Sequence, residues 1–271
     1  MNEPDPAHDK SDGRGASVLL NGIAVLRSFT ATDVELRVSE IARRVGLHKS
    51  TVSRILATLH QQGLVERDPE TRRFRLGLEV VSLAGPLLSS LDVRRVAYPV
   101  LQNLADRTGE TSALLLWNGT ASVCVEQVPG RHLVGHSTPV GTRLTHALSA
   151  SVQVFLGSQP EAEVAALLGN GTISDPSLVR GGVAAYLSRI REAAATGFAV
   201  NYGETLPDEV GVAAPVFDHR GCIAAAAQIS APRFRISRDA LPRLGAMSAE
   251  AALEITTALG GNASNVTQQN R

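Results

Sequence analysis

The chain has 271 residues and a mass of 28.5 kDa, enough for one large domain or two of ordinary size. Hydrophobic residues make up 44% of it and charged residues 19%, a globular composition that excludes disorder as the main state. Lys plus Arg and Asp plus Glu each number 26, so the formal net charge is zero and any nucleic-acid site must be local.

Cysteine usage and hydropathy indicate a reducing compartment. Cys124 and Cys222 each lie among apolar residues without a CxxC motif, so we expect two buried free thiols. No apolar run approaches the roughly 20 residues that span a bilayer, and residues 1–14 lack the apolar core of a secretory signal. The seven histidines show no spacing typical of a helical metal site. The sequence predicts a cytoplasmic protein that contacts no membrane and needs no metal or cofactor.

Composition and periodicity divide the chain into five segments. Residues 1–14 and 260–271 are polar and are expected to be disordered tails. Residues 15–77 form a compact helical unit that ends in a hairpin. Residues 78–92 are mostly apolar and predict a linker helix, too apolar for one small domain to cover, that contacts a second copy of the chain. Residues 93–259 form the second domain.

The second domain mixes both periodicities. After a helix that ends near Thr108, period-two alternation predicts strands, and helical spacing predicts helices between them. The strands are expected over 112–117, 122–128, 132–137, 210–217 and 222–230, and the helices over 149–157, 161–168, 179–197 and 238–259. This order suits an α+β domain better than a βαβ repeat.

Residues 36–63 predict two short helices joined by a glycine turn. Ser39 can cap the first helix, Gly46 supplies the turn, and the second helix begins near His48. Apolar residues of the second helix fall on one face: Val52, Ile55, Leu56 and Leu59. Its other face is small, polar and basic: Lys49, Ser50, Thr51, Ser53, Arg54, Ala57 and Gln61. Such a face can enter the major groove of DNA, although a merely solvated face is the alternative.

A basic hairpin follows. Residues 64–76 alternate towards a turn at Asp68-Pro69-Glu70 and back, and residues 14–76 hold eleven Lys or Arg against six acids. A hairpin in this place is expected to act as a wing that holds phosphates. We expect base contacts from Ser50, Thr51, Ser53 and Arg54, and the other contacts from Arg43, Arg44, His48, Lys49, Arg67, Arg72, Arg73 and Arg75.

Two segments resemble the isocitrate lyase regulator (IclR) family of bacterial transcription factors. They are VSEIARRVGLHKSTVSRILATLHQQGLVERDPETRRFRLG, residues 38–77, and GVAAPVFDHRGCIAAAAQISAP, residues 211–232. Element order extends the resemblance to residues 17–257. The resemblance implies a winged helix-turn-helix domain, a linker helix and a GAF-like α/β effector-binding domain, with homodimers that often pair into homotetramers.

The resemblance also implies an effector site on one side of the sheet. The implied positions are Leu133, His136, Ser149, Ala150, Ser151, Asn201, Gly211, Gln228 and Ser230. Ser149 is the candidate N-cap of a helix whose first N–H groups, at Ala150 and Ser151, could hold an anion. The chain departs from the family where Asn201 replaces a frequent acid and Gln228 replaces a smaller residue.

These positions predict the class of the effector. His136 is the only one of them that can carry a positive charge, so a phosphate or a dicarboxylate fits poorly. We expect a small organic acid, aromatic acids included, that is singly charged or neutral. The alternative is that Gln228 and Ser230 only satisfy backbone groups at the sheet edge.

A search for enzyme motifs finds none. Residues 135–139 lack the second glycine of a nucleophile elbow, and residues 169–174 read as a turn after a helix and not as a dinucleotide loop. The adjacent acids Asp208 and Glu209 are expected in a solvated loop. We favour an effector-responsive regulator, most simply a repressor of a catabolic operon with a palindromic operator on double-stranded DNA. An enzyme acting on a small carboxylic acid, and a DNA-binding protein whose second domain only dimerises it, remain alternatives.

Overall fold

The computed structural model describes residues 9–90, 92–174 and 181–261. Its internal contacts divide the chain into two compact units, Met1–Ser90 and Leu91–Arg271. The tails expected at 1–14 and 260–271 lie mostly outside the described residues, except that the first helix begins at Asp9.

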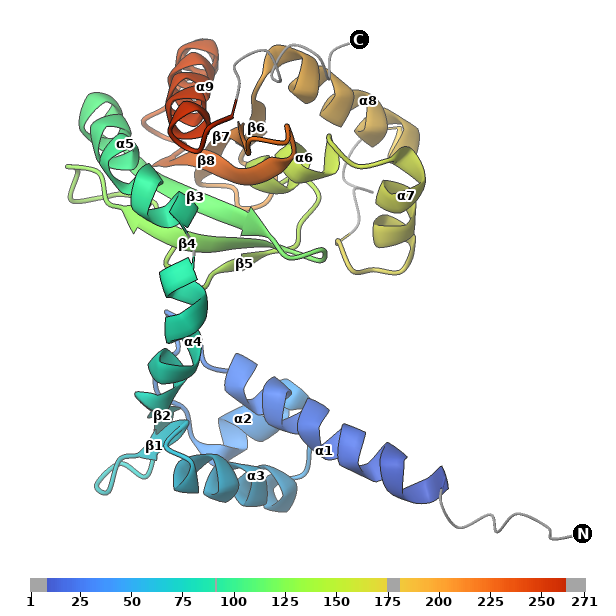
Figure 1. Ribbon diagram of the computed structural model, residues 1–271. Helices are drawn as coiled ribbons and strands as arrows, with labels where there is room; N and C mark the ends of the chain where they lie inside the picture. The colour runs from blue at the N-terminus through green and yellow to red at the C-terminus, as the bar shows by residue number, and fades with distance from the viewer. Residues whose placement is uncertain (1–8, 91, 175–180, 262–271) are drawn as a thin grey trace, which may run out of the picture. The chain divides into compact units, whose positions relative to one another are not determined.

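The first unit is a helix-turn-helix followed by a hairpin (Figure 1). Its elements are α1 (Asp9–Arg27), α2 (Val38–Val45), α3 (Lys49–Gln61), β1 (Val65–Arg67), β2 (Phe74–Leu76) and α4 (Glu79–Ser90). Val25, Ile41, Val52 and Leu56 are fully buried together between the first three helices. The apolar stripe predicted for the second helix of the motif is therefore confirmed.

Local chemistry fixes where α2 and α3 begin and end. Arg37, and not Ser39 as the sequence suggested, occupies the N-cap of α2, and its N–H donates to Glu40 Oε2 at 2.7 Å. Gly46 ends α2 with φ +67°, a left-handed conformation that favours glycine. His48 caps α3, because its ring Nδ1 accepts the N–H of Ser50.

The second unit is an α+β domain built on one antiparallel sheet (Figure 1). The strands are β3 (Thr111–Trp117), β4 (Ser122–Val128), β5 (Arg143–Leu144), β6 (Ala199–Tyr202), β7 (Glu209–Phe217) and β8 (Ile223–Pro232), in the order β5-β4-β3-β8-β7-β6. The helices are α5 (Asp92–Thr108), α6 (Ala150–Leu156), α7 (Glu161–Gly169), α8 (Gly182–Thr196) and α9 (Leu241–Ala258), with a 3-10 turn at Arg238–Ala240.

Helices cover both faces of this sheet. On one face α5 and α9 bury the larger apolar side chains of the central strands, such as Leu114, Val212 and Ile229. On the other face α6 packs on small side chains, such as Ala113 and Ala213, and α7 and α8 pack around α6. These small residues set the depth of the space under α6.

Three expectations for this domain are wrong. The strand expected over 132–137 does not form; the segment is an irregular loop in which Leu133 is fully exposed. Cys222, expected to be buried, is exposed at a hairpin, whereas burial of Cys124 raises the pKa of its thiol to about 12. Glu209 begins β7 and does not lie in a solvated loop. No helix of the described residues is long and apolar enough to cross a membrane.

Candidate functional site

The residues of α3 that we expect to meet DNA lie on its exposed face. Thr51, Ser53 and Arg54 are all exposed, while Val52 and Leu56 of the same helix are buried. The Ser50 hydroxyl lies 2.8 Å from His48 Nδ1, so this serine also helps to order the helix start. Short side chains along the face let the helix backbone approach a groove floor closely.

Three of the expected phosphate-binding arginines have partners within their own domain. Arg44 pairs with Asp33 at 3.0 Å, and Arg75 pairs with Glu66 at 2.9 Å. Arg73 donates to the backbone carbonyl of Glu35 at 3.1 Å. These side chains organise the domain without DNA, a role that the sequence did not predict, and their phosphate contacts stay a prediction.

Four other cationic side chains of this unit are exposed and have no partner among the described residues. Arg43, Lys49, Arg54 and Arg72 are exposed, and their side chains form no hydrogen bond or ion pair with any described residue. Arg72 has φ +56° and stands at the hairpin tip. Arg67 lies over the Phe74 ring, 5.7 Å from its centroid. The free cations therefore come from α2, α3 and the hairpin, and their contacts with DNA phosphates stay a prediction.

Asp68 shapes the tip of the hairpin. Its Oδ1 accepts the N–H of Glu70 at 2.9 Å, the N–H of Thr71 at 2.6 Å and the Thr71 hydroxyl at 2.9 Å. These hydrogen bonds from Thr71 and Glu70 hold the pKa of Asp68 below its usual value. The wing is thus held by a carboxylate that stays ionised.

The second unit contains a cavity of about 260 Å³ between the sheet and the start of α6. Its lining comes from three parts of the chain: Arg143, Leu144, Thr145, His146, Ser149 and Ala150; Asn201, Thr205, Leu206, Glu209 and Gly211; and Gln228. Gly211 pairs with Asn201 on one side and with Ser230 on the other, so these residues share one row of the sheet. The volume of the cavity fits a small organic molecule.

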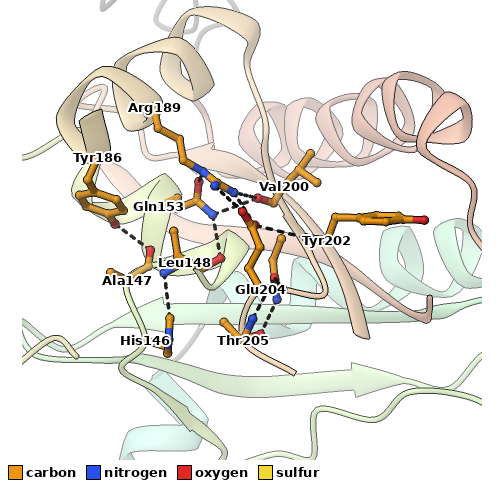
Figure 2. A network of polar contacts seen from close by, with 11 residues as sticks. His146, Ala147, Leu148, Gln153, Tyr186, Arg189, Val200, Tyr202, Glu204 and Thr205 are labelled. Atoms are coloured by element: carbon orange, nitrogen blue, oxygen red, sulfur yellow. Dashed lines mark hydrogen bonds and ion pairs between the residues drawn. The ribbon is translucent and has the colours of Figure 1, made fainter. Parts of the chain in front are cut away.

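A polar network beside the cavity fixes its shape (Figure 2). Arg189 of α8 holds Glu204 at 2.6 Å and donates to Gln153 Oε1 at 2.9 Å. Burial alone would raise the pKa of Glu204, but the paired Arg189 holds that pKa below its usual value. Asn201 Oδ1 accepts the N–H groups of Glu204 and Thr205. The loop after β6 is therefore tied to α6 and α8 before any ligand binds.

A second chain of polar contacts starts at the cavity floor. Gln228 Nε2 donates to Ser230 Oγ at 3.0 Å, and Ser230 Oγ lies 3.3 Å from Thr138 Oγ1. Gln228 Oε1 is buried and has no partner among the described residues. These contacts involve side chains only, so the alternative in which Gln228 and Ser230 satisfy backbone groups at a sheet edge does not describe this structure.

Three ionisable groups of the lining were not expected from the sequence: Arg143, His146 and Glu209. Burial raises the pKa of Glu209, and His136, 3.4 Å away, opposes that shift. Burial lowers the pKa of His146, whose Nδ1 accepts the N–H of Leu148 at 3.1 Å. Arg143 stands at the edge of the cavity without an ion pair to any described residue. The positive charge expected from His136 alone can thus also come from Arg143.

The implied effector positions are only partly brought together. Five of the nine line the cavity: Ser149, Ala150, Asn201, Gly211 and Gln228. Ser230 and His136 lie one contact behind the lining. Ser151 is buried against Ser122 at 2.9 Å, and the exposed Leu133 lies outside, so these two expectations are not met. No group of His, Cys, Asp or Glu in the described ranges could hold a metal ion.

A winged helix-turn-helix and a cavity-bearing α+β domain in one chain define a ligand-responsive class of transcriptional regulator. The family model of the IclR helix-turn-helix domain matches residues 18–69, and that of the bacterial transcriptional regulator IclR C-terminal domain matches residues 86–257. The chain therefore belongs to the IclR family, as the two sequence segments indicated.

Individual proteins of the IclR family are similar to this chain over most of its length. The transcriptional repressor IclR of Escherichia coli is 28% identical over 253 residues, 90% of each chain. An IclR family transcriptional regulator from Brucella abortus is 27% identical with a TM-score of 0.72, over 94% of this chain and 96% of that chain. An IclR homolog from Microbacterium hydrocarbonoxydans, crystallised with 4-hydroxybenzoate, is 24% identical with a TM-score of 0.71, over 89% and 98%. The last likeness shows the fold alone.

Proposed function

We propose that this protein is a cytoplasmic, effector-responsive repressor and not an enzyme, and that a small organic acid in the cavity under α6 changes its affinity for an operator. The observation that carries the proposal is the cavity itself, which a domain serving only for dimerisation would not need. Relatives named as repressors support the direction of control. An operator near a catabolic operon is the expected target.

The chemistry of the lining favours a monoacid. Arg143 supplies one positive charge at the edge of the cavity, and Glu209 opposes a second negative charge on the ligand. A phosphate or a dicarboxylate would leave a charge without a partner, which is costly inside a protein. The 4-hydroxybenzoate of the Microbacterium hydrocarbonoxydans homolog is a ligand of this class.

The proposal is tested by measuring DNA binding and ligand binding on the full chain. Fluorescence anisotropy with the DNA upstream of the protein's own gene should show tight binding that weakens when an aliphatic or aromatic monoacid is added. Gly211→Ala is the matched cavity variant, because its methyl group would lie 3.6 Å from Ala150 Cβ and so fit without a clash while narrowing the cavity. We expect Gly211→Ala to bind the DNA as the parent does but to keep that affinity when the acid is added. If the acid weakens DNA binding of this variant as much as that of the parent, the cavity is not the effector site.

We further propose self-association through apolar surface of the first unit. Val18, Leu19 and Leu20 of α1 are 63–66% exposed, and Val81 and Leu83 of α4 are 61% and 66% exposed. Apolar surface of this extent is typical of contacts between subunits. A homodimer, or a homotetramer made of two such dimers, would cover it and present two copies of α3 to one operator.

A further inference from the structure

Gln228 carries a buried polar atom that has no partner in the part of the chain that the structure describes. The residue is only 2% exposed, and its Nε2 donates to Ser230 Oγ, whereas Oε1 accepts no hydrogen bond. Buried carbonyl oxygens are nearly always hydrogen-bonded in folded proteins, so an unmatched one needs an explanation.

The position of Gln228 points to a ligand. Gln228 lies on β8 between Ala113 of β3 and Ala213 of β7, so its long side chain stands among small neighbours on the cavity side of the sheet. A Cβ added to Gly211 would lie 4.0 Å from Gln228 Nε2. Gln228 is therefore part of the cavity floor.

The other amides near the cavity are already satisfied. Asn201 uses Nδ2 to reach Thr205 Oγ1 and Oδ1 to accept two backbone N–H groups. Gln153 uses Nε2 for the Leu148 and Val200 carbonyls and Oε1 for Arg189 (Figure 2). Among the amides of these described residues, the Gln228 oxygen is the acceptor left for a ligand.

Resting on the proposed role of the cavity as the effector site, we propose that Gln228 is a specificity-determining residue that selects an effector with a hydroxyl or N–H group in addition to its acid group. Such a group donates to Oε1. A keto, ether or fluoro group in the same place presents another acceptor and leaves Oε1 unmatched, and sites of this kind reject the analogue that lacks the donor. The effector class narrows from organic acids to hydroxy, amino and amido acids.

The test uses acids that differ only at the donor. Binding of 4-hydroxybenzoate and 4-fluorobenzoate, and of lactate and pyruvate, is measured by calorimetry on the full-length parent, on Gln228→Met and on Gln102→Met. Met has nearly the length of Gln but no carbonyl, and Gln102→Met makes the same change on the exposed side of α5. We expect the parent to prefer a hydroxy acid by about tenfold, Gln102→Met to keep this preference and Gln228→Met to lose it.

The outcomes separate the inference from the proposed function. A parent that binds both members of a pair equally, or a Gln228→Met variant that keeps the preference, overturns the role of Gln228 and leaves the effector site intact. Absence of binding by all four acids contradicts the proposed effector class instead. Thermal unfolding without ligand is an independent readout: Gln228→Met removes the unmatched oxygen together with the Nε2 hydrogen bond to Ser230 Oγ, so the two losses should offset each other and Tm should change little. A fall in Tm of about 3 °C or more would make the amide structural and overturn the proposal.

Discussion

Arg54 has the properties of a base-reading residue. It is exposed on α3 and uncommitted, in contrast to Arg44 and Arg75, which are held by carboxylates. If it reaches guanine in a bidentate contact, Arg54→Ala should cost roughly 1–3 kcal/mol at the cognate operator and little on random DNA.

Arg72→Ala is the matched comparison for this prediction. Arg72 stands at the hairpin tip, where phosphates and not bases are expected, so its loss should weaken all DNA alike and lower the salt slope by about one unit. Anisotropy titrations on both DNAs at several salt concentrations make the distinction. Equal losses on cognate and random DNA for Arg54→Ala would remove it from the base-reading set.

Glu209 predicts a pH dependence. Burial raises its folded-state pKa above the unfolded value of about 4.3, so its stabilising contribution is present below that pH and is lost as the pH rises through the raised pKa. At neutral pH the buried carboxylate is therefore unfavourable, and it also repels an anionic ligand. Glu209→Gln should raise Tm at pH 7.5 and tighten binding of 4-hydroxybenzoate several-fold.

The pH profile checks the cause. Between pH 5 and pH 8 the parent should bind 4-hydroxybenzoate more weakly as the pH rises, and Glu209→Gln should flatten this trend. The exposed Glu163 on α7 provides the control variant Glu163→Gln. A slope that survives in Glu209→Gln would assign the dependence to another group.

At the scale of elements, the sequence predicted correctly those helices and strands that depend on residues close together in the chain. The stripe of α3 and the hairpin of β1 and β2 are each visible within about a dozen residues, because a helix face and a tight turn depend on short sequence spacing. The start of α2 was misplaced, because the Glu40 side chain reaches back to the Arg37 N–H and outweighs the hydroxyl of Ser39.

The alternation of polar and apolar residues gave a wrong prediction where strand pairing depends on segments distant in the chain. Residues 132–137 alternate like a strand, but they pair with no strand, and the outer edge of β4 pairs instead with the two-residue β5 at Ser122 and Val123. The carbonyl of Val134 is instead bound by Arg235 at 2.9 Å. Strands as short as β5 and β6 carry too few residues for alternation to be recognised.

The hydrogen bonds that Asp68 accepts at the hairpin tip predict how the wing contributes to DNA affinity. Asp68→Ala removes the acceptor of three hydrogen bonds, so the hairpin tip should lose its shape and DNA affinity should fall several-fold on every sequence. Asp68→Asn keeps an oxygen acceptor and should retain most of the affinity. Anisotropy measures both variants, and circular dichroism checks that α1, α2 and α3 persist. Full affinity in Asp68→Ala would show that the tip does not touch DNA.

At the scale of the whole molecule, the cavity could be predicted only in part. Gln228, Gly211 and Asn201 were found because the family resemblance and the strand period place them on one face. Arg143 and Glu209 were missed, because nothing in one sequence shows that segments more than 60 residues apart in the chain meet at one cavity. The sequence already favoured a monoacid, but the charged groups of the lining, Arg143 and Glu209, became visible only in the structure.

The exposed apolar side chains of α4 predict that the protein self-associates. Leu83 is 66% exposed on α4, so Leu83→Asp places a charge on surface that we propose to be covered in the dimer. Sedimentation should show a monomer for this variant where the parent is a dimer, and Leu83→Met, which keeps the apolar volume, should remain dimeric. Two α3 helices related by a twofold axis read half-sites about one helical turn, roughly 10 bp, or a multiple of it apart. Loss of the second α3 should therefore weaken binding to the palindrome about a hundredfold and leave binding to an isolated half-site unchanged. A Leu83→Asp variant that stays dimeric, or that binds the half-site less well than the parent, would assign the contact to another surface or the defect to misfolding.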